Sequence, residues 1–263
     1  LGKALKKNVA RNQVVIASKV YFNEGRLSRQ AIMREIDGTL SRLGTDYLDL
    51  YIIHRFDYDT PIEETMEALH DLVKAGKVRA LGASAMYGYQ FYNMQLAARD
   101  NGWTPFSAME NHYNLLYRED ERELLPICKQ MKVSLMPYSP LAAGHLARPQ
   151  WKSESLRGTT DRVAMGKYDK TEAEDMQIVK RVAELAEKYN CKMSQIAIAW
   201  QWAKGILSPI IGATKTQYLD DSAGAFDIKL TAEDLAFLEE PYVPHEIVGA
   251  IDKNPAQGVI LLD

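Results

Sequence analysis

The chain has 263 residues, 46% hydrophobic and 25% charged, so it can bury a sizeable core and is typical of one globular domain. Its net charge of −3, from 32 Lys and Arg against 35 Asp and Glu, argues against nucleic acid as a partner. Without a segment apolar enough to span a bilayer, a signal peptide or a cysteine pattern for disulfides or metal, the sequence predicts a cytoplasmic protein.

The first strand-helix unit follows the opening residues LGKALKKNVA, which have the composition of the last turns of a helix. A strand is predicted over residues 13–17, just before Lys19. A helix is predicted from Ser28, because Ile32, Ile36 and Leu40 fall on one face, and Gly44 marks its end.

The second unit contains the stretch YLDLYIIHRFD, residues 47–57, whose apolar core predicts a buried strand. Polar side chains begin abruptly at its end with His54. Thr60 and Pro61 then predict a capped helix, which carries an apolar stripe and ends at Gly76.

Four further strands are predicted over residues 78–84, 106–113, 133–140 and 208–213. A helix that carries Phe91, Met94 and Ala98 is predicted after the first of these strands. Further helices are predicted near residues 119–131, 171–189, 194–204, 217–226 and 231–239. A long polar loop over residues 142–170 interrupts the pattern, and such loops are often functional. Residues 241–263, with three prolines, predict a surface tail.

Six strand-helix units in one direction predict a parallel sheet covered by helices, and the continuously apolar strands favour a (β/α)8 TIM barrel. Eight units close such a barrel, so two more are expected before Leu1. The alternative is an open doubly wound sheet. That fold would predict a glycine fingerprint after the first strand, where the chain reads SKVYFNEGRLS.

Polar residues lie at the carboxyl ends of the predicted strands, which meet at one rim in a barrel. Lys19 and His54 are the pair of interest there, because an ammonium and an imidazole suit a carbonyl oxygen that gains negative charge. Taken singly, a lysine at a strand end is usually solvated, and a lone histidine is more often structural.

The ordered motifs IASKV, YLDLYIIHRFD, LGAS, HYN, PYSPLAAG and SPIIGATK resemble the aldo-keto reductases over most of the chain. The resemblance implies one barrel domain over residues 1–263 that binds NADPH and reduces aldehydes or ketones by hydride transfer. It places Lys19 and His54 in the catalytic tetrad. The family's aspartate and tyrosine belong to a segment expected before Leu1, and the chain offers no substitute.

The resemblance also implies a cofactor site. Ser84 and Glu110 would hold the carboxamide, Tyr138 would stack on the nicotinamide, and Arg148 would clamp phosphate as a bidentate donor. Without the family, Tyr138 is equally well a core aromatic. Glu110 stands where the family carries glutamine. The full predicted set is Ser84, Glu110, Tyr138, Ser139, Pro140, Leu141, Gly144, Arg148, Gly212, Thr214, Lys215, Tyr218, Asp221 and Ser222, with no metal.

Three functions stay open on the sequence. The first is an NADPH-dependent reductase of a small carbonyl substrate. The second is a non-catalytic NADPH-binding module for partner interaction, as in the potassium-channel β subunits that resemble this family. The third is a phosphate-binding barrel isomerase or lyase.

Overall fold

The computed structural model describes residues 1–152, 159–249 and 251, which fall into two compact units. Unit 1 contains Leu1–Glu110 and Ile127–Val133, and unit 2 contains Asn111–Pro126 and the described part of Ser134–Asp252. That residues 1–263 form one barrel domain stays a prediction. None of the helices in the described part has the length and hydropathy that crossing a membrane requires.

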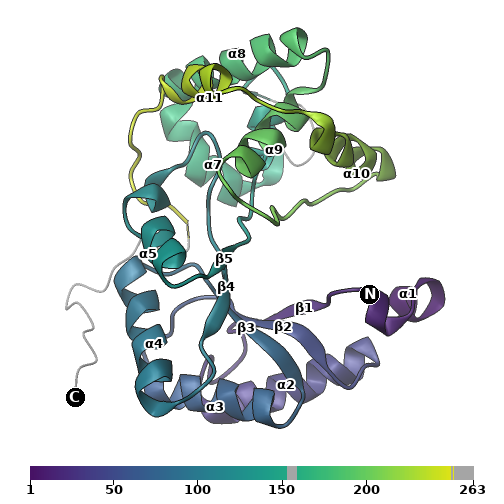
Figure 1. Cartoon of the computed structure of the whole chain (residues 1–263), viewed down its shortest axis with the longest axis vertical. Coiled ribbons are helices and arrows are strands. Elements are labelled where there is room, and N and C mark those ends of the chain that lie inside the picture. The colour runs from purple at the N-terminus through teal and green to yellow at the C-terminus, as the bar shows by residue number, and fades with distance from the viewer. Residues whose placement is uncertain (153–158, 250, 252–263) are drawn as a thin grey trace. The chain divides into compact units, whose positions relative to one another are not determined.

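Unit 1 is a parallel α/β structure. Its strands β1 (Ala17–Val20), β2 (Leu48–Ile53), β3 (Val78–Ser84) and β4 (Phe106–Glu110) pair in sequence order. Helices α2 (Arg29–Leu43), α3 (Ile62–Lys74) and α4 (Gly88–Asn101) follow the first three strands and pack side by side (Figure 1). The chain opens with α1 (Gly2–Asn8) and a 3-10 turn, η1 (Arg11–Gln13).

The caps of α2 are those that the sequence predicts. The Ser28 hydroxyl accepts a hydrogen bond from the Ala31 amide, and Gly44 ends the helix with a φ of 68°. The cap predicted at Thr60 is wrong, because the Thr60 hydroxyl donates instead to the Asp57 carboxylate, 2.8 Å away. Pro61 therefore precedes α3 without a side-chain cap.

The first strand starts later than predicted. Of the predicted residues 13–17, only Ala17 belongs to it, because the η1 turn ends at Gln13 and β1 begins at Ala17. The Arg11 guanidinium holds the turn by donating to the Tyr47 carbonyl, at 2.9 Å, and to the Asp49 carboxylate, at 2.7 Å.

Unit 2 is mainly helical around one apolar core that includes Tyr113, Ile178, Val182, Ile196 and Trp200. Its elements are η2 (Glu119–Arg122), β5 (Ser134–Leu135), η3 (Ala142–Ala147), α7 (Arg162–Tyr168), η4 (Asp169–Thr171), α8 (Glu172–Lys188), α9 (Met193–Ala203), α10 (Thr216–Ala223), η5 (Gly224–Asp227) and α11 (Ala232–Glu239). Helix α5 (Leu124–Gln130) continues from unit 2 into unit 1.

The last predicted strands are shorter than expected or absent. The strand expected over residues 133–140 is only Ser134–Leu135, and residues 208–213 form no strand, so the sixth strand-helix unit is not formed as predicted. Prolines at 137, 140 and 209 lack the amide that a continuous ladder needs. The two segments still share a hydrogen bond, which the Ile210 amide donates to the Pro137 carbonyl at 2.9 Å.

The predicted loop over residues 142–170 contains η3 and α7, whereas its residues 153–158 lie outside the described part. In the predicted tail, residues 241–249 contain no helix or strand, and residues 250 and 252–263 lie outside the described part.

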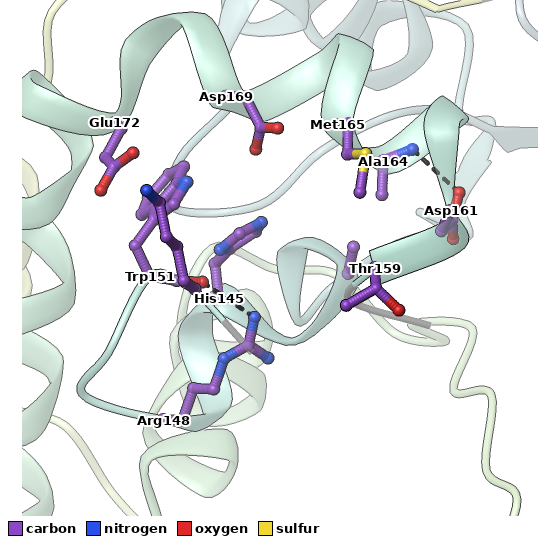
Figure 2. Close-up of a pocket in the computed structure, with 11 residues that line it drawn as sticks. His145, Arg148, Trp151, Thr159, Asp161, Ala164, Met165, Asp169 and Glu172 are labelled. Carbon is purple, nitrogen blue, oxygen red and sulfur yellow. Dashed lines mark hydrogen bonds between the residues drawn. The ribbon is translucent and has the colours of Figure 1, made fainter. Parts of the chain in front are cut away.

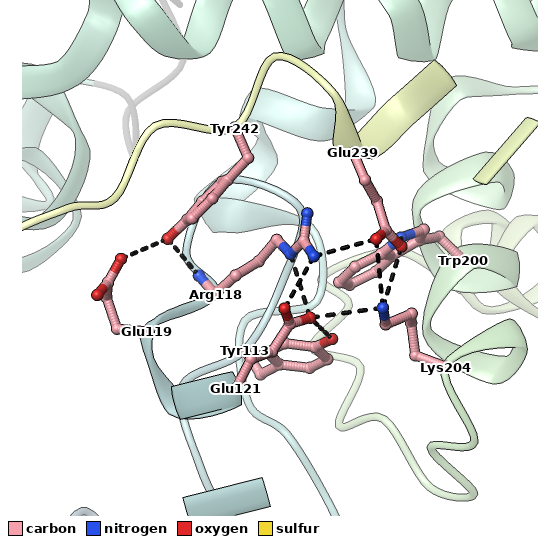
Figure 3. Close-up of polar contacts among 8 residues, drawn as sticks. All are labelled: Tyr113, Arg118, Glu119, Glu121, Trp200, Lys204, Glu239 and Tyr242. Atoms are coloured by element: carbon pink, nitrogen blue, oxygen red, sulfur yellow. Dashed lines mark hydrogen bonds and ion pairs between the residues drawn. The ribbon is translucent and has the colours of Figure 1, made fainter. Parts of the chain in front are cut away.

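A polar cluster ties η2, α9 and α11 together inside unit 2 (Figure 3). The Arg118 guanidinium donates to Glu121, at 2.8 Å, and to Glu239, at 3.0 Å, while its side chain is only 11% exposed. Glu239 also accepts from the Trp200 indole at 2.9 Å. Without Arg118, Glu121 and Glu239 would keep the Lys204 ammonium, at 3.6 Å and 3.2 Å, but would lose their shorter ion pairs, which is unfavourable.

We expect Arg118→Met to lower the free energy of unfolding by about 2 kcal/mol, less than a fully buried pair costs because Glu121 and Glu239 are partly exposed. Urea unfolding measures the change. Arg99→Met removes an ion pair whose side chains are 68% and 60% exposed, so this control should change stability by less than about 0.5 kcal/mol. Equal losses in the two variants would contradict a central role for Arg118.

The carboxyl of Asp120, in η2, changes its protonation near neutral pH. Burial raises the pKa of its carboxyl to about 7, although the Asn111 amide donates to it at 2.9 Å. The folded chain therefore keeps this proton up to about pH 7, whereas the unfolded chain releases it near 3.8. The contribution of Asp120 to stability falls as the pH rises between these values.

Asp120→Asn should remove this penalty. The variant should be more stable than wild type at pH 8, and the gain should shrink toward pH 5, by up to about 1.4 kcal/mol for each pKa unit. Thermal unfolding between pH 5 and pH 8 tests this, with exposed Asp220→Asn as the control. A gain that does not depend on pH would show that the carboxyl is not the cause.

Candidate functional site

The register of the parallel strands places four predicted site residues on one face of the unit 1 sheet. Lys19 pairs with Ile52, which pairs with Gly82, which pairs with Ala108. Side chains two residues apart share a face, so His54, Ser84 and Glu110 lie on the same face as this row, one pleat nearer the carboxyl ends. The opposite face of the sheet meets the helices. Tyr51 lies on that face, and the pKa of its hydroxyl is raised mainly by burial and also responds to the charges of Glu35 and Arg42 on α2.

Lys19 and Glu110 form an ion pair across this face. The Lys19 Nζ lies 2.9 Å from the Glu110 Oε2, although β2 and β3 separate their strands. Three strand spacings amount to about 14 Å in a flat sheet, so the sheet must curve toward this face. The Glu110 side chain is 7% exposed and that of Lys19 is 31% exposed, which leaves the ammonium accessible.

His54 continues the ladder beyond β2, because its amide donates to the Val20 carbonyl at 2.9 Å. Burial, followed by the charges of Lys19 and Arg55, lowers the pKa of the imidazole below its ordinary value. The ring is therefore neutral at pH 7 and can donate a hydrogen bond to a carbonyl oxygen. Phe22 packs edge-on against it, with 4.9 Å between the ring centroids.

Ser84 forms a hydrogen bond to the backbone of Glu110, a second residue on this face. Its hydroxyl donates to the Glu110 main-chain carbonyl at 2.7 Å and is buried. Ala85, directly after it, has a φ of 49°, a left-handed backbone that side chains rarely adopt. Strain of this kind occurs most often at functional sites.

Asp57 fixes the two loops that follow β1 and β2. Its buried carboxylate accepts from the Leu27 amide at 3.1 Å, the Thr60 hydroxyl at 2.8 Å and the Asp59 amide at 3.1 Å. These bonds hold the loop of Phe22 beside the loop of His54. Sequence reasoning missed that Asp57 joins these loops, because the available signal was a polar residue after an apolar strand.

The cofactor residues predicted in unit 2 fall on two segments, joined by the bond from Ile210 to Pro137. The first includes Tyr138, whose ring stacks on His112 at 5.2 Å, with the Lys167 ammonium 4.6 Å from its centroid. A nicotinamide could stack on this ring only where the Lys167 ammonium now lies.

The backbone after Tyr138 is left-handed at several residues. Ser139, Ala142 and Ala143 have φ values of 57°, 46° and 55°, and Gly144 has 100°. Pro140 and Leu141 complete this turn. Left-handed residues in a tight turn can direct amides toward an anion, which is compatible with the predicted passage of the pyrophosphate.

Arg148 lies after this turn and lines a pocket of about 410 Å³ (Figure 2). Its terminal nitrogens donate to the Gly144 carbonyl, at 2.9 Å, and the Trp151 carbonyl, at 3.0 Å. Each of these nitrogens keeps a second N–H, and the Nε is buried without a hydrogen-bond partner among the described residues. The bidentate clamp on phosphate stays a prediction. Burial lowers the pKa of the guanidinium.

The second segment runs from Gly212 to α10. Gly212, Thr214 and Lys215 are exposed before the helix, and Lys215 precedes its first turn without a side-chain cap. Asp221 is paired with Lys192 at 2.6 Å, and the Ser222 hydroxyl donates to the Tyr218 carbonyl at 2.7 Å. These side chains are thus already bonded to the protein.

A buried aromatic group around His112 was not predicted as part of the site. His112 stacks between Tyr117, at 4.2 Å, and Tyr138, at 5.2 Å, and its Nε2 lies 2.8 Å from the Tyr168 hydroxyl. Burial lowers its pKa well below the ordinary value. The motif NHYN, at the end of the fourth strand, was the available signal for it.

Each unit, taken by itself, offers groups that could contact a bound nucleotide. An exposed lysine and hydroxyls lie at the start of α10, where a helix N-terminus favours phosphate. Glu110 offers a buried carboxylate oxygen that lies 2.9 Å from the Lys19 ammonium and has no hydrogen-bond partner among the described residues. Within that same part of the chain, no three His, Cys, Asp or Glu side chains are grouped to hold a metal ion.

The Aldo/keto reductase family model matches residues 1–242. An aldo-keto reductase of Fusarium vanettenii is 46% identical over 233 residues, which cover 88% of this chain and 62% of that protein. Versiconal hemiacetal acetate reductase of Aspergillus parasiticus is 42% identical over 94% of this chain and 79% of its own length.

A putative aryl-alcohol dehydrogenase of Schizosaccharomyces pombe is 39% identical, covering 95% of this chain and 79% of that protein. The crystal structure of a thermostable aldo-keto reductase with the inhibitor epalrestat has a TM-score of 0.74 and 28% identity, over 91% of this chain and 75% of that one. The chain spans about three fifths of the Fusarium relative, 62% of its length.

These matches, together with the parallel strands of unit 1, confirm the predicted fold class, the (β/α)8 barrel of this family. The structure contributes a parallel α/β part of that barrel. The chain belongs to the aldo/keto reductase family.

Proposed function

We propose that the complete protein reduces aldehydes or ketones to alcohols with NADPH. The observation that carries the proposal is the common face of Lys19 and His54 at the carboxyl ends of β1 and β2. Barrel enzymes do their chemistry at this end of the strands. Relatives named as reductases and as an aryl-alcohol dehydrogenase support oxidoreductase chemistry in general.

The described residues supply the part of the reaction that concerns the carbonyl oxygen. Neutral His54 donates a hydrogen bond to that oxygen and orients it, and the accessible Lys19 ammonium stabilises the charge that develops there. When bound, the nicotinamide nucleotide supplies the hydride. The proton donor that the resemblance implies, a tyrosine, is not assigned to a residue of the described part of the chain.

The test is NADPH oxidation by the complete gene product with 4-nitrobenzaldehyde. Lys19→Met should lower kcat/KM by roughly 10²- to 10⁴-fold, and His54→Ala should cause a loss in the same range, because each removes stabilisation of the developing charge. Lys3→Met, at an exposed position, is the matched control and should keep full activity.

Tight NADPH binding without turnover of any aldehyde would contradict the catalytic proposal. That outcome would favour the non-catalytic module of the potassium-channel β-subunit type. Full activity in Lys19→Met and His54→Ala would show that the chemistry takes place elsewhere.

We further propose that Lys215 and the first turn of α10 bind the 2′-phosphate that distinguishes NADPH from NADH. Lys215→Met should weaken NADPH binding by roughly tenfold and leave NADH binding nearly unchanged, because a single charge-assisted contact is lost. Fluorescence titration measures this, with exposed Lys180→Met on α8 as the control. Equal weakening for the two nucleotides would place the 2′-phosphate elsewhere.

A further inference from the structure

Glu110 brings a buried carboxylate to the face that carries Lys19 and His54. The residue is the last of β4, and its backbone is fixed because its carbonyl accepts the Ser84 hydroxyl at 2.7 Å. Its Oε2 lies 2.9 Å from the Lys19 Nζ in an ion pair whose angles fall short of a hydrogen bond.

Two of the strands between the residues leave room for this contact beyond Ile52. The row from Lys19 continues through Ile52 to Gly82 and Ala108, and neither of the last two has a side chain long enough to block the path. A Cβ on Gly82 would come within 3.0 Å of the Ile52 side chain and 3.4 Å of the Ala108 carbonyl. The small residues therefore let the Lys19 side chain extend toward β4.

The pair sets the charge at this face. Lys19 contributes a positive charge, Glu110 cancels it, and His54 is neutral at pH 7. Arg55 adds a second cation, placed over the Phe22 ring at 5.0 Å. Asp57 does not compensate it, because that carboxylate is taken by the loop amides and Thr60.

We propose that Glu110 is a specificity-determining residue that favours uncharged carbonyl substrates over those carrying a carboxylate beside the carbonyl. This inference rests on the proposed reductase function. An ammonium without a counter-ion attracts a neighbouring carboxylate of the substrate, whereas an ammonium already paired with a buried carboxylate does so much less. The carboxylate of a 2-oxo acid would also be repelled by Glu110 itself.

The test compares phenylglyoxylate with its methyl ester, which have the same skeleton and differ by one charge. Glu110→Gln in the complete protein removes the charge and keeps the shape of the side chain. We expect the ratio of KM for phenylglyoxylate to KM for the ester to fall roughly tenfold, and this change to shrink at high salt. Exposed Glu63→Gln is the matched control.

Binding is measured separately from turnover. Calorimetric titration of phenylglyoxylate into the complex with oxidised NADP should show the same gain in affinity for Glu110→Gln. Glu110→Asp keeps the charge but is shorter by one methylene, so it should lie between wild type and Glu110→Gln. It carries the test if Glu110→Gln no longer folds, as thermal unfolding would show.

The outcomes separate the two proposals. Equal changes for the acid and the ester, or an unchanged ratio in the two Glu110 variants, would overturn the inference and leave the reductase function intact. Wild-type protein that binds NADPH and turns over no carbonyl compound would overturn the proposed function, and the inference with it.

Discussion

The parallel register of β1 to β4 is the constraint on which the candidate site depends. Because Lys19, Ile52, Gly82 and Ala108 stand in one row, the residues two positions further along share their face. One slipped residue in any strand would turn its polar side chain toward the helices. The buried residues of the opposite face, such as Tyr51 and Met109, oppose such a slip, because it would expose them.

The sequence predicts the repeated elements of unit 1 well, because short apolar strands, apolar helix faces and a glycine such as Gly44 act locally. It predicts unit 2 less well. There the predicted strands over residues 133–140 and 208–213 are apolar enough, but Pro137, Pro140 and Pro209 remove the amides that a ladder needs. Apolar composition alone does not distinguish a strand from a buried extended segment.

Side-chain partners were the hardest part of the site to predict, because they depend on how distant segments fold together. Thr60 stands in a sequence typical of a helix cap, yet its hydroxyl donates to the Asp57 carboxylate instead of capping α3. Arg148 has the chemistry of a phosphate ligand, yet two main-chain carbonyls take its terminal nitrogens. The motifs identified Lys19 and Glu110 separately, and only a curved sheet brings them into contact.

The ion pairs of Lys19 and of Arg118 differ in how much capacity they leave the cation for contact with a ligand. Arg118 is 11% exposed, donates to two carboxylates and lies under the rings of Trp200 and Tyr242, so it has little capacity for a ligand. Lys19 is 31% exposed and pairs with one carboxylate among the described residues, that of Glu110, although an ammonium can donate three hydrogen bonds. Its remaining donors point to a role toward a bound molecule, and Glu110 then sets how strongly the charge acts on it.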